Sequence, residues 1–249
     1  MSKIIIMKLV ADLHVHTIAS GHAYSTVEEV VRSAREKGLL MVGIAEHGPR
    51  LPGGPHMYYF GNLRVIPREL WGVRVLKGVE ANIISPEGEL DLPERFLAQL
   101  DFVFAGFHVN TGFDGGTVEE NTRAMIGAMR NPYVDGIVHP GNPAYSVDIE
   151  AVVKAAKEMG KLLEINNSSL TLTRTDSLPN CQEFARRIAQ LDAEAIIGSD
   201  AHFSTLVGTF DAAVALAEAA GLTERHVINT SAERVLRFLE ARRTSGIYA

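Results

Sequence analysis

Seven of the nine histidines and two acids follow directly after short apolar runs of this sequence. These residues are His14, His16, His22, His47, Glu80, His108, His139, Asp200 and His202. A lone histidine is usually a packed or hydrogen-bonded side chain. Seven imidazoles gathered at the same end of successive strands would repel one another when protonated and would need partners when neutral. Divalent metal ions meet both needs, so the pattern predicts a metal centre.

The number of candidate ligands exceeds what one ion takes, because a zinc site usually has three or four ligands. A carboxylate can bridge two ions, so two or three ions are expected. Imidazole-rich ligation favours Zn²⁺, Mn²⁺ or Fe²⁺ over Mg²⁺ or Ca²⁺, and the sequence does not choose among the first three. Three such ions and two carboxylates leave about four positive charges, which would attract a phosphate dianion and hold a hydroxide, as in phosphoester hydrolysis.

The elements that must position these residues are also visible in the sequence. Apolar runs occur at 8–13, 40–45, 73–81, 102–107, 136–138, 162–165 and 195–197. Helical patterns occupy 26–37, 118–129, 148–159, 181–190, 210–220 and 232–242. Continuous apolar runs between helices predict parallel strands that are buried on both faces.

Seven strand–helix units predict a single domain over residues 1–249, an α/β barrel of the TIM-like type. An open doubly wound sheet is the alternative. In a barrel the C-terminal ends of the strands converge on one face, which would bring the candidate ligands together.

Two local features refine this expectation. Ser25, followed by Glu28, has the spacing of a helix capping box. The connection over residues 48–72 is long, and connections of this length are uncommon unless they are functional. We expect it to form a lid or substrate loop, and a packed surface excursion is the alternative. His226 falls near a C-terminal helix and is expected on the surface.

Composition excludes several classes of protein. The chain has 249 residues and a formal net charge of −6, which argues against long nucleic acid or an anionic membrane as a partner. Cys181 is the single cysteine, so no intramolecular disulfide is possible, as is typical of a reducing compartment. Neither a signal peptide nor a membrane span is visible, so we expect a cytoplasmic protein. Met7 is an alternative start.

Several segments resemble the PHP (polymerase and histidinol phosphatase) family. They are Asp12-Leu13-His14-Val15-His16-Thr17, Glu46-His47-Gly48, Gly78-Val79-Glu80, Gly106-Phe107-His108, His139-Pro140 and Gly198-Ser199-Asp200-Ala201-His202. Three further segments are similar to the YcdX-type bacterial phosphatases within that family, namely residues 20–25, 139–143 and 163–169. The resemblance covers nearly the whole chain, and the order and spacing of the motifs make it specific.

The resemblance implies a distorted (β/α)₇ barrel with a trinuclear centre, usually of zinc. By position, one metal would be held by His14, His16, Glu80 and Asp200. Glu80 would bridge to a second metal that His108 and His139 also hold. The third metal would take His22, His47 and His202. One departure from the family pattern is Glu46, where the family usually has Asp, and its longer side chain is expected to affect how His47 is oriented.

Candidate substrate residues are fewer. Arg64 lies in the long connection and matches the YcdX type, so it could clamp a phosphate group. Asn166 and Asn167 end the one apolar run that carries no candidate ligand. They could contact a ligand histidine or the substrate, or they could cap the turn that follows.

The resulting hypothesis is a metal-dependent phosphomonoesterase that acts on a small phosphorylated substrate through a metal-bound hydroxide. No Gly-x-Ser-x-Gly elbow, P-loop or dinucleotide motif is present, which disfavours covalent catalysis and nucleotide cofactors. The alternatives are a phosphodiesterase or exonuclease acting on nucleotides, and a non-catalytic metal-binding barrel. The physiological substrate, the metal, the general acid and the oligomeric state, a homo-oligomer included, stay open.

Overall fold

Seven parallel strands frame the molecule in this computed structural model, which describes residues 7–244. They pair in the order β1-β2-β4-β5-β6-β7-β8, and the short β3 pairs antiparallel with β4. The strands are β1 (Ala11–Val15), β2 (Met41–His47), β3 (Glu69–Leu70), β4 (Val73–Asn82), β5 (Phe102–Gly106), β6 (Gly136–Ile137), β7 (Leu162–Asn166) and β8 (Ala195–Gly198). Residues 1–6, which an alternative start at Met7 would remove, lie outside the described residues.

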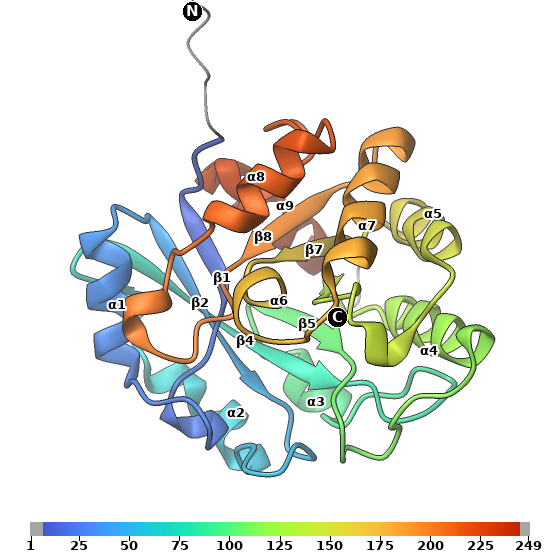
Figure 1. Cartoon of the computed structure of the whole chain (residues 1–249). Helices are drawn as coiled ribbons and strands as arrows, with labels where there is room; N and C mark the ends of the chain where they lie inside the picture. Colours follow the sequence, from blue (N-terminus) through green and yellow to red (C-terminus); the bar gives the residue numbers. More distant parts are fainter. Residues whose placement is uncertain (1–6, 245–249) are drawn as a thin grey trace, which may run out of the picture.

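Helices surround the strands, as Figure 1 shows. The α-helices are α1 (Val27–Glu36), α2 (Met57–Asn62), α3 (Glu94–Leu97), α4 (Val118–Arg130), α5 (Ile149–Met159), α6 (Ser168–Thr171), α7 (Leu178–Leu191), α8 (Asp211–Ala219) and α9 (Ala232–Thr244). Short 3-10 helices are η1 (Ile18–Ser20), η2 (Leu63–Val65), η3 (Pro143–Tyr145), η4 (Ser204–Leu206) and η5 (Ile228–Thr230). The architecture is a distorted (β/α)₇ barrel in a single domain.

The barrel closes where β1 approaches β8, although the two strands pair only partly. One parallel bridge joins Val15 to Ala201. The fully buried side chain of Asn229 fills the rest of the seam. Its Nδ2 donates to the carbonyl oxygens of Ala11 and Ile197, both at 2.8 Å, and its Oδ1 accepts the N–H of Ile197 at 3.2 Å. An amide side chain thus replaces the missing strand-to-strand hydrogen bonds.

Replacing Asn229 by alanine is therefore expected to destabilise the fold. The change removes three hydrogen bonds and leaves buried backbone groups without partners, which lowers the free energy of unfolding by about 3 kcal/mol. Urea denaturation measures this quantity. Asn62→Ala, at an exposed position where the asparagine makes no capping bond, is the control. Equal changes in the two variants would show that the seam does not depend on Asn229.

Two apolar layers hold the strands in place. The outer layer lies between strands and helices and includes Val42, Ile44, Val75 and Val79. The inner layer fills the barrel. It includes residues of every long strand together with two from α9, namely Leu13, Met41, Leu76, Phe102, Phe104, Leu162, Ile196, Val235 and Leu239. Since apolar side chains occupy the barrel interior, the polar residues of the strands gather at the C-terminal ends.

The predicted strands and long helices are confirmed, with small shifts at their ends. One cap is wrong by one residue. Helix α1 begins with a capping box made by Thr26 and Glu29, and not by Ser25 and Glu28. The hydroxyl of Ser25 instead accepts the N–H of Ser204, in the loop after β8. A tertiary hydrogen bond therefore shifts the cap along the chain.

The long connection over residues 48–72 is mostly packed structure. It contains α2, η2 and β3, and it buries Phe60 and Leu63 in the outer core. Its first part also reaches the candidate site, because Leu51 and Pro52 line the cavity described below. The segment thus combines the two expected roles. Within residues 7–244, no helix is long and apolar enough to cross a membrane.

Candidate metal centre

Glu80, on β4, lies at the middle of the histidine cluster and is fully buried. Each of its carboxylate oxygens faces a different group of imidazoles. Glu80 Oε2 lies 2.7 Å from His47 Nδ1, 3.3 Å from His16 Nε2 and 3.4 Å from His14 Nε2. Glu80 Oε1 lies 2.5 Å from His139 Nε2 and 3.0 Å from His108 Nε2. Five histidines from the ends of four strands, β1, β2, β5 and β6, therefore converge on one carboxylate.

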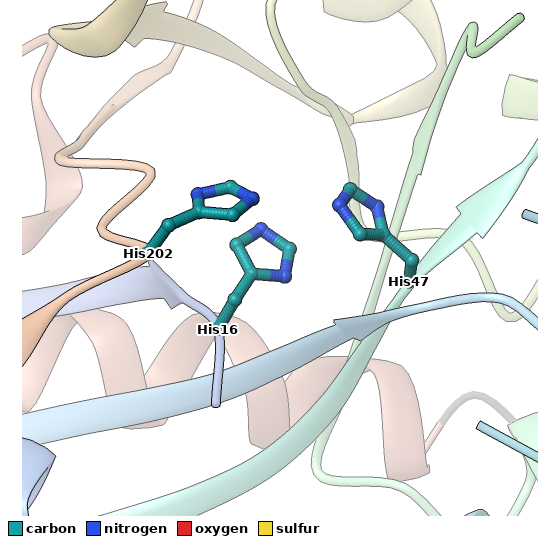
Figure 2. A group of neighbouring side chains, drawn as sticks. All are labelled: His16, His47 and His202. Atoms are coloured by element: carbon teal, nitrogen blue, oxygen red, sulfur yellow. The ribbon is translucent and has the colours of Figure 1, made fainter. Parts of the chain in front are cut away.

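Asp200 organises a second part of the cluster, after β8. Its Oδ1 lies 3.3 Å from His16 Nε2 and 3.5 Å from His202 Nδ1. Figure 2 shows the rings of His16, His47 and His202 extending toward one another from separate segments. His202 Nε2 lies 3.1 Å from His22 Nε2, so two imidazole nitrogens face each other at the outer edge. A shared cation at this edge would satisfy both nitrogens.

The backbone at the strand ends is shaped to aim these side chains. A bulge in β1 places Leu13 and His14 together opposite β2, because the register shifts between Asp12 and Val15. His139 and Asp200 have positive φ angles of 34° and 55°, which non-glycine residues rarely adopt. Strained backbone of this kind is concentrated at functional sites in proteins.

Two glycines leave the space that the cluster needs. A Cβ at Gly198 would lie 2.9 Å from His14 Cβ and would collide with the Glu164 carboxylate. A Cβ at Gly106 would lie 2.8 Å from His139 Cε1. Both glycines are the last residues of their strands. Neighbouring side chains approach these positions so closely that a residue with a Cβ would not fit.

Glu164 on β7 supports the cluster from below. Its Oε1 lies 2.7 Å from His14 Nδ1, and its Oε2 accepts the backbone N–H of His139 at 2.8 Å. Asn166 donates to Glu164 Oε2 at 3.0 Å and to Asp200 Oδ2 at 3.3 Å. Its own Oδ1 accepts the N–H of Ser169 at 2.8 Å. Asn166 thus caps the turn, as one of the two alternatives expected, and its amide contacts two carboxylates and not a ligand histidine.

Glu46 supports the cluster on the opposite side through the loop after β1. Its carboxylate accepts hydrogen bonds from the N–H of Thr17 at 3.1 Å and from the hydroxyl of Ser20 at 2.5 Å. Ser20 Oγ in turn accepts the backbone N–H of His47 at 3.2 Å and lies 3.4 Å from His16 Nδ1. The expected influence of Glu46 on His47 therefore passes through Ser20.

Burial and charge set the protonation states in the cluster. Burial lowers the pKa of His16, and the nearby charge of His47 lowers it further. Burial also lowers the pKa of His139, to about 4. Burial alone would raise the pKa of Glu80 and Asp200, but surrounding cationic groups hold both well below the ordinary range. His14 differs, because the carboxylates of Glu164, Asp200 and Glu80 outweigh the effect of burial and raise its pKa well above the ordinary value. Metal ions bind neutral imidazoles and ionised carboxylates, so metal binding at His14 would displace a proton.

The donor atoms fit divalent metal ions. Seven buried atoms of the cluster have no hydrogen-bond partner among the described residues: Nε2 of His14, His16 and His108, Nδ1 of His47 and His108, Oε2 of Glu80 and Oδ1 of Asp200. Buried polar atoms are normally satisfied, so a group of unpaired ligand atoms that face one another is typical of a metal-binding site. Three sets have ligand atoms within 4.8 Å of one another: His14 with His16 and Asp200, His47 with Glu80 and His108, and His16 with His47 and His202.

A cavity of about 630 Å³ opens above the cluster. His22, His47, His108, Asp200 and His202 line its floor, and apolar side chains, including Phe107 and Leu172, line its sides. Arg174, in the segment between α6 and α7, also lines it. The guanidinium of Arg174 donates from Nη1 to Asp200 Oδ2 at 2.9 Å. A cation is therefore held at the boundary between the cluster and the cavity.

All nine predicted ligands lie in this one cluster, whereas Arg64 does not. Arg64 lines a different cavity, outside the barrel. Asn167 uses its Oδ1 to accept the N–H of Ala213 in α8. The expected surface position of His226 is wrong, because this residue is buried and its Nδ1 accepts the N–H of Thr223. The sequence analysis assigned no role to Glu164, although it lies in the 163–169 segment, or to Arg174, which no motif contains.

Comparison with known proteins agrees with this geometry. The model of the PHP domain matches residues 12–139, which include seven of the nine clustered residues. The chain belongs to the PHP domain family. It is 51% identical over 237 residues to a probable phosphatase of Caldanaerobacter subterraneus, covering 95% of this chain and 93% of the relative. It is 50% identical to a probable phosphatase of Acetivibrio thermocellus, covering 95% and 98%.

A solved structure of this family shows the same fold. The histidinol phosphate phosphatase of Lactococcus lactis, determined with zinc, L-histidinol and phosphate, superposes with a TM-score of 0.57. It is 16% identical in sequence, and the match covers 86% of this chain and 94% of that one. At this identity the likeness supports the PHP barrel and not a shared substrate.

Proposed function

We propose that this PHP protein is a metal-dependent phosphomonoesterase with a trinuclear centre. The observation that carries the proposal is the convergence of seven histidines and two carboxylates beside a cavity, six of which present buried ligand atoms that have no hydrogen-bond partner among the described residues. The relatives named as probable phosphatases and the zinc-containing histidinol phosphatase support the same activity. The cavity volume of about 630 Å³ suits a small phosphorylated substrate.

The nine clustered residues would hold three divalent ions, of which zinc is the first candidate and Mn²⁺ or Fe²⁺ the alternatives. When bound, such ions polarise a phosphoryl oxygen and lower the pKa of water. Glu80 offers its two oxygens to different imidazole groups, as a bridging carboxylate would. His16 and His47 each lie in two of the three close sets, so either could contribute to neighbouring metal ions.

The remaining residues of the site prepare it for a phosphate monoester. Arg174 is held by Asp200 with its guanidinium at the cavity wall, where it can donate to a non-bridging phosphoryl oxygen. Glu164 fixes the orientation of the His14 ring through Nδ1, which leaves Nε2 directed at Glu80 and Asp200. The apolar sides of the cavity exclude water around the leaving group.

Comparing two aryl substrates tests the proposal. We expect the protein, purified without chelator and supplied with zinc, manganese or iron, to hydrolyse p-nitrophenyl phosphate much faster than bis(p-nitrophenyl) phosphate. A dianionic monoester meets both the positive centre and Arg174, whereas a diester carries one charge and a second bulky group. The reverse preference would indicate a phosphodiesterase. Hydrolysis of neither substrate would indicate a non-catalytic metal-binding barrel.

A further inference from the structure

A second polar cavity lies outside the barrel and is independent of the metal centre. Its volume is about 300 Å³, and none of its lining residues also lines the cavity above the cluster. Three cationic side chains line it: Arg64 and Arg68 from the long connection, and Lys77 from β4. One carboxylate, Asp101, is also part of the lining. The cationic groups therefore outnumber the carboxylate.

Lys77 is the residue that makes this cavity unusual. It is only 8% exposed, although lysine is rarely buried unless it is paired. Burial lowers the pKa of Lys77, the charge of Asp101 opposes this shift, and Arg68 adds to it. The carboxylate of Asp101 also contacts the main chain of Lys77, because Asp101 Oδ2 accepts the backbone N–H of Lys77 at 3.0 Å.

Within the part of the chain that the structure describes, the charged ends of these three cations form no ion pair, although the charge of Asp101 acts on Lys77. Among the described residues, ion pairs within 4.0 Å engage Arg174, Arg187 and Arg225, but none engages Arg64, Arg68 or Lys77. The backbone nevertheless holds the group together. The carbonyl of Arg68 accepts the N–H of Val75, which ties the long connection to the strand that carries Lys77. The backbone thus places three cationic residues around one small cavity.

We propose that this cavity binds a phosphate-class anion, either inorganic phosphate or the phosphoryl group of a small molecule. Arginine forks match tetrahedral oxyanions with paired hydrogen bonds, and a lysine adds a compact positive charge. The ligand would join Arg64 and Arg68 of the long connection to Lys77 of β4. This site lies apart from the metal centre and does not depend on the proposed phosphatase activity.

Isothermal titration of the metal-loaded protein tests the proposal. Inorganic phosphate is titrated first, and phenylphosphonate, which carries an organic group and resists hydrolysis, is titrated second. We expect two binding events in the wild type, one at the metal centre and one at the outer cavity. Arg64→Gln and Lys77→Met should each weaken one event by about tenfold or more, since each removes a charge-assisted contact. Binding of phenylphosphonate at the outer site would identify an organic phosphoryl ligand, and binding of phosphate alone would identify the free ion.

Two controls separate this site from the metal centre. Arg74→Gln removes a cation from the same strand at a position outside the cavity lining, and it should leave both events unchanged. The inhibition of aryl phosphate hydrolysis by phosphate reports the metal centre, and it should be the same in the wild type and in Arg64→Gln. The outer site would be overturned if the wild type shows no binding event, or if Arg64→Gln and Lys77→Met both preserve every event that the wild type shows. Arg64 is exposed, so its replacement tests the site even if Lys77→Met does not fold.

Discussion

Glu80→Gln is expected to abolish phosphatase activity almost completely. The variant keeps the size of the side chain but removes a charge that faces imidazoles on both of its oxygens. It would leave five histidines without the anion that draws cations to the cluster. Loss of a metal ion removes several kcal/mol of charge stabilisation in the transition state, so kcat/KM should fall by about 10⁴-fold. Hydrolysis of p-nitrophenyl phosphate and elemental analysis measure both consequences.

A matched variant shows whether this loss belongs to the cluster. Glu158→Gln makes the same chemical change at an exposed position on α5, and it should leave both metal content and rate unchanged. Thermal unfolding checks that Glu80→Gln is folded. A folded Glu80→Gln protein with the metal content and rate of the wild type would contradict the assignment of Glu80 as the bridging ligand.

Arg174→Gln should have the second largest effect on turnover. A guanidinium at the cavity wall would donate hydrogen bonds to the phosphoryl oxygens in the transition state. Loss of one such donor lowers kcat/KM by about a hundredfold. Inhibition by inorganic phosphate should weaken as well, because the product makes the same contact. Arg174→Lys should recover part of the rate, since it restores the charge without the paired donors.

The contact between Arg174 and Asp200 permits a different outcome, and metal analysis distinguishes the two. If Arg174 binds phosphate, Arg174→Gln keeps its metal ions and loses rate and phosphate affinity. If Arg174 serves only to hold Asp200, metal content and rate fall together, and phosphate inhibition of the residual activity is unchanged. Arg187→Gln, which alters an arginine paired with Glu150 and Glu183 on the outer helices, is the control.

The sequence predicts those parts of the fold that depend on neighbouring residues in the chain, and not on contacts between distant segments. Strands such as β4 are buried on both faces, so their apolar runs stand out without any knowledge of neighbours. The nine clustered residues could be predicted together because parallel strands of a barrel bring their C-terminal ends to one face. His14, Glu80 and Asp200 thus meet although they are far apart in the chain.

The residues that escaped prediction depend on tertiary contacts. Glu164 lies inside β7, and its role appears only when the barrel closes and places His14 beside it. Arg174 follows a four-residue helix and has a positive φ of 50°, a conformation that no local pattern encodes. Arg64 was predicted to be near the substrate, but the path of a long connection is set by packing, which places it at another cavity.

If the clustered residues hold three metal ions and the protein hydrolyses phosphate monoesters, metal content and activity must fall together. Elemental analysis of the wild type and of His22→Ala, each purified without chelator, measures the first quantity, and p-nitrophenyl phosphate hydrolysis on the same samples measures the second. We expect close to three ions per chain in the wild type, and the loss of one ion together with most of the activity in His22→Ala. One ion or none, with no hydrolysis after addition of zinc, manganese or iron, would contradict this expectation.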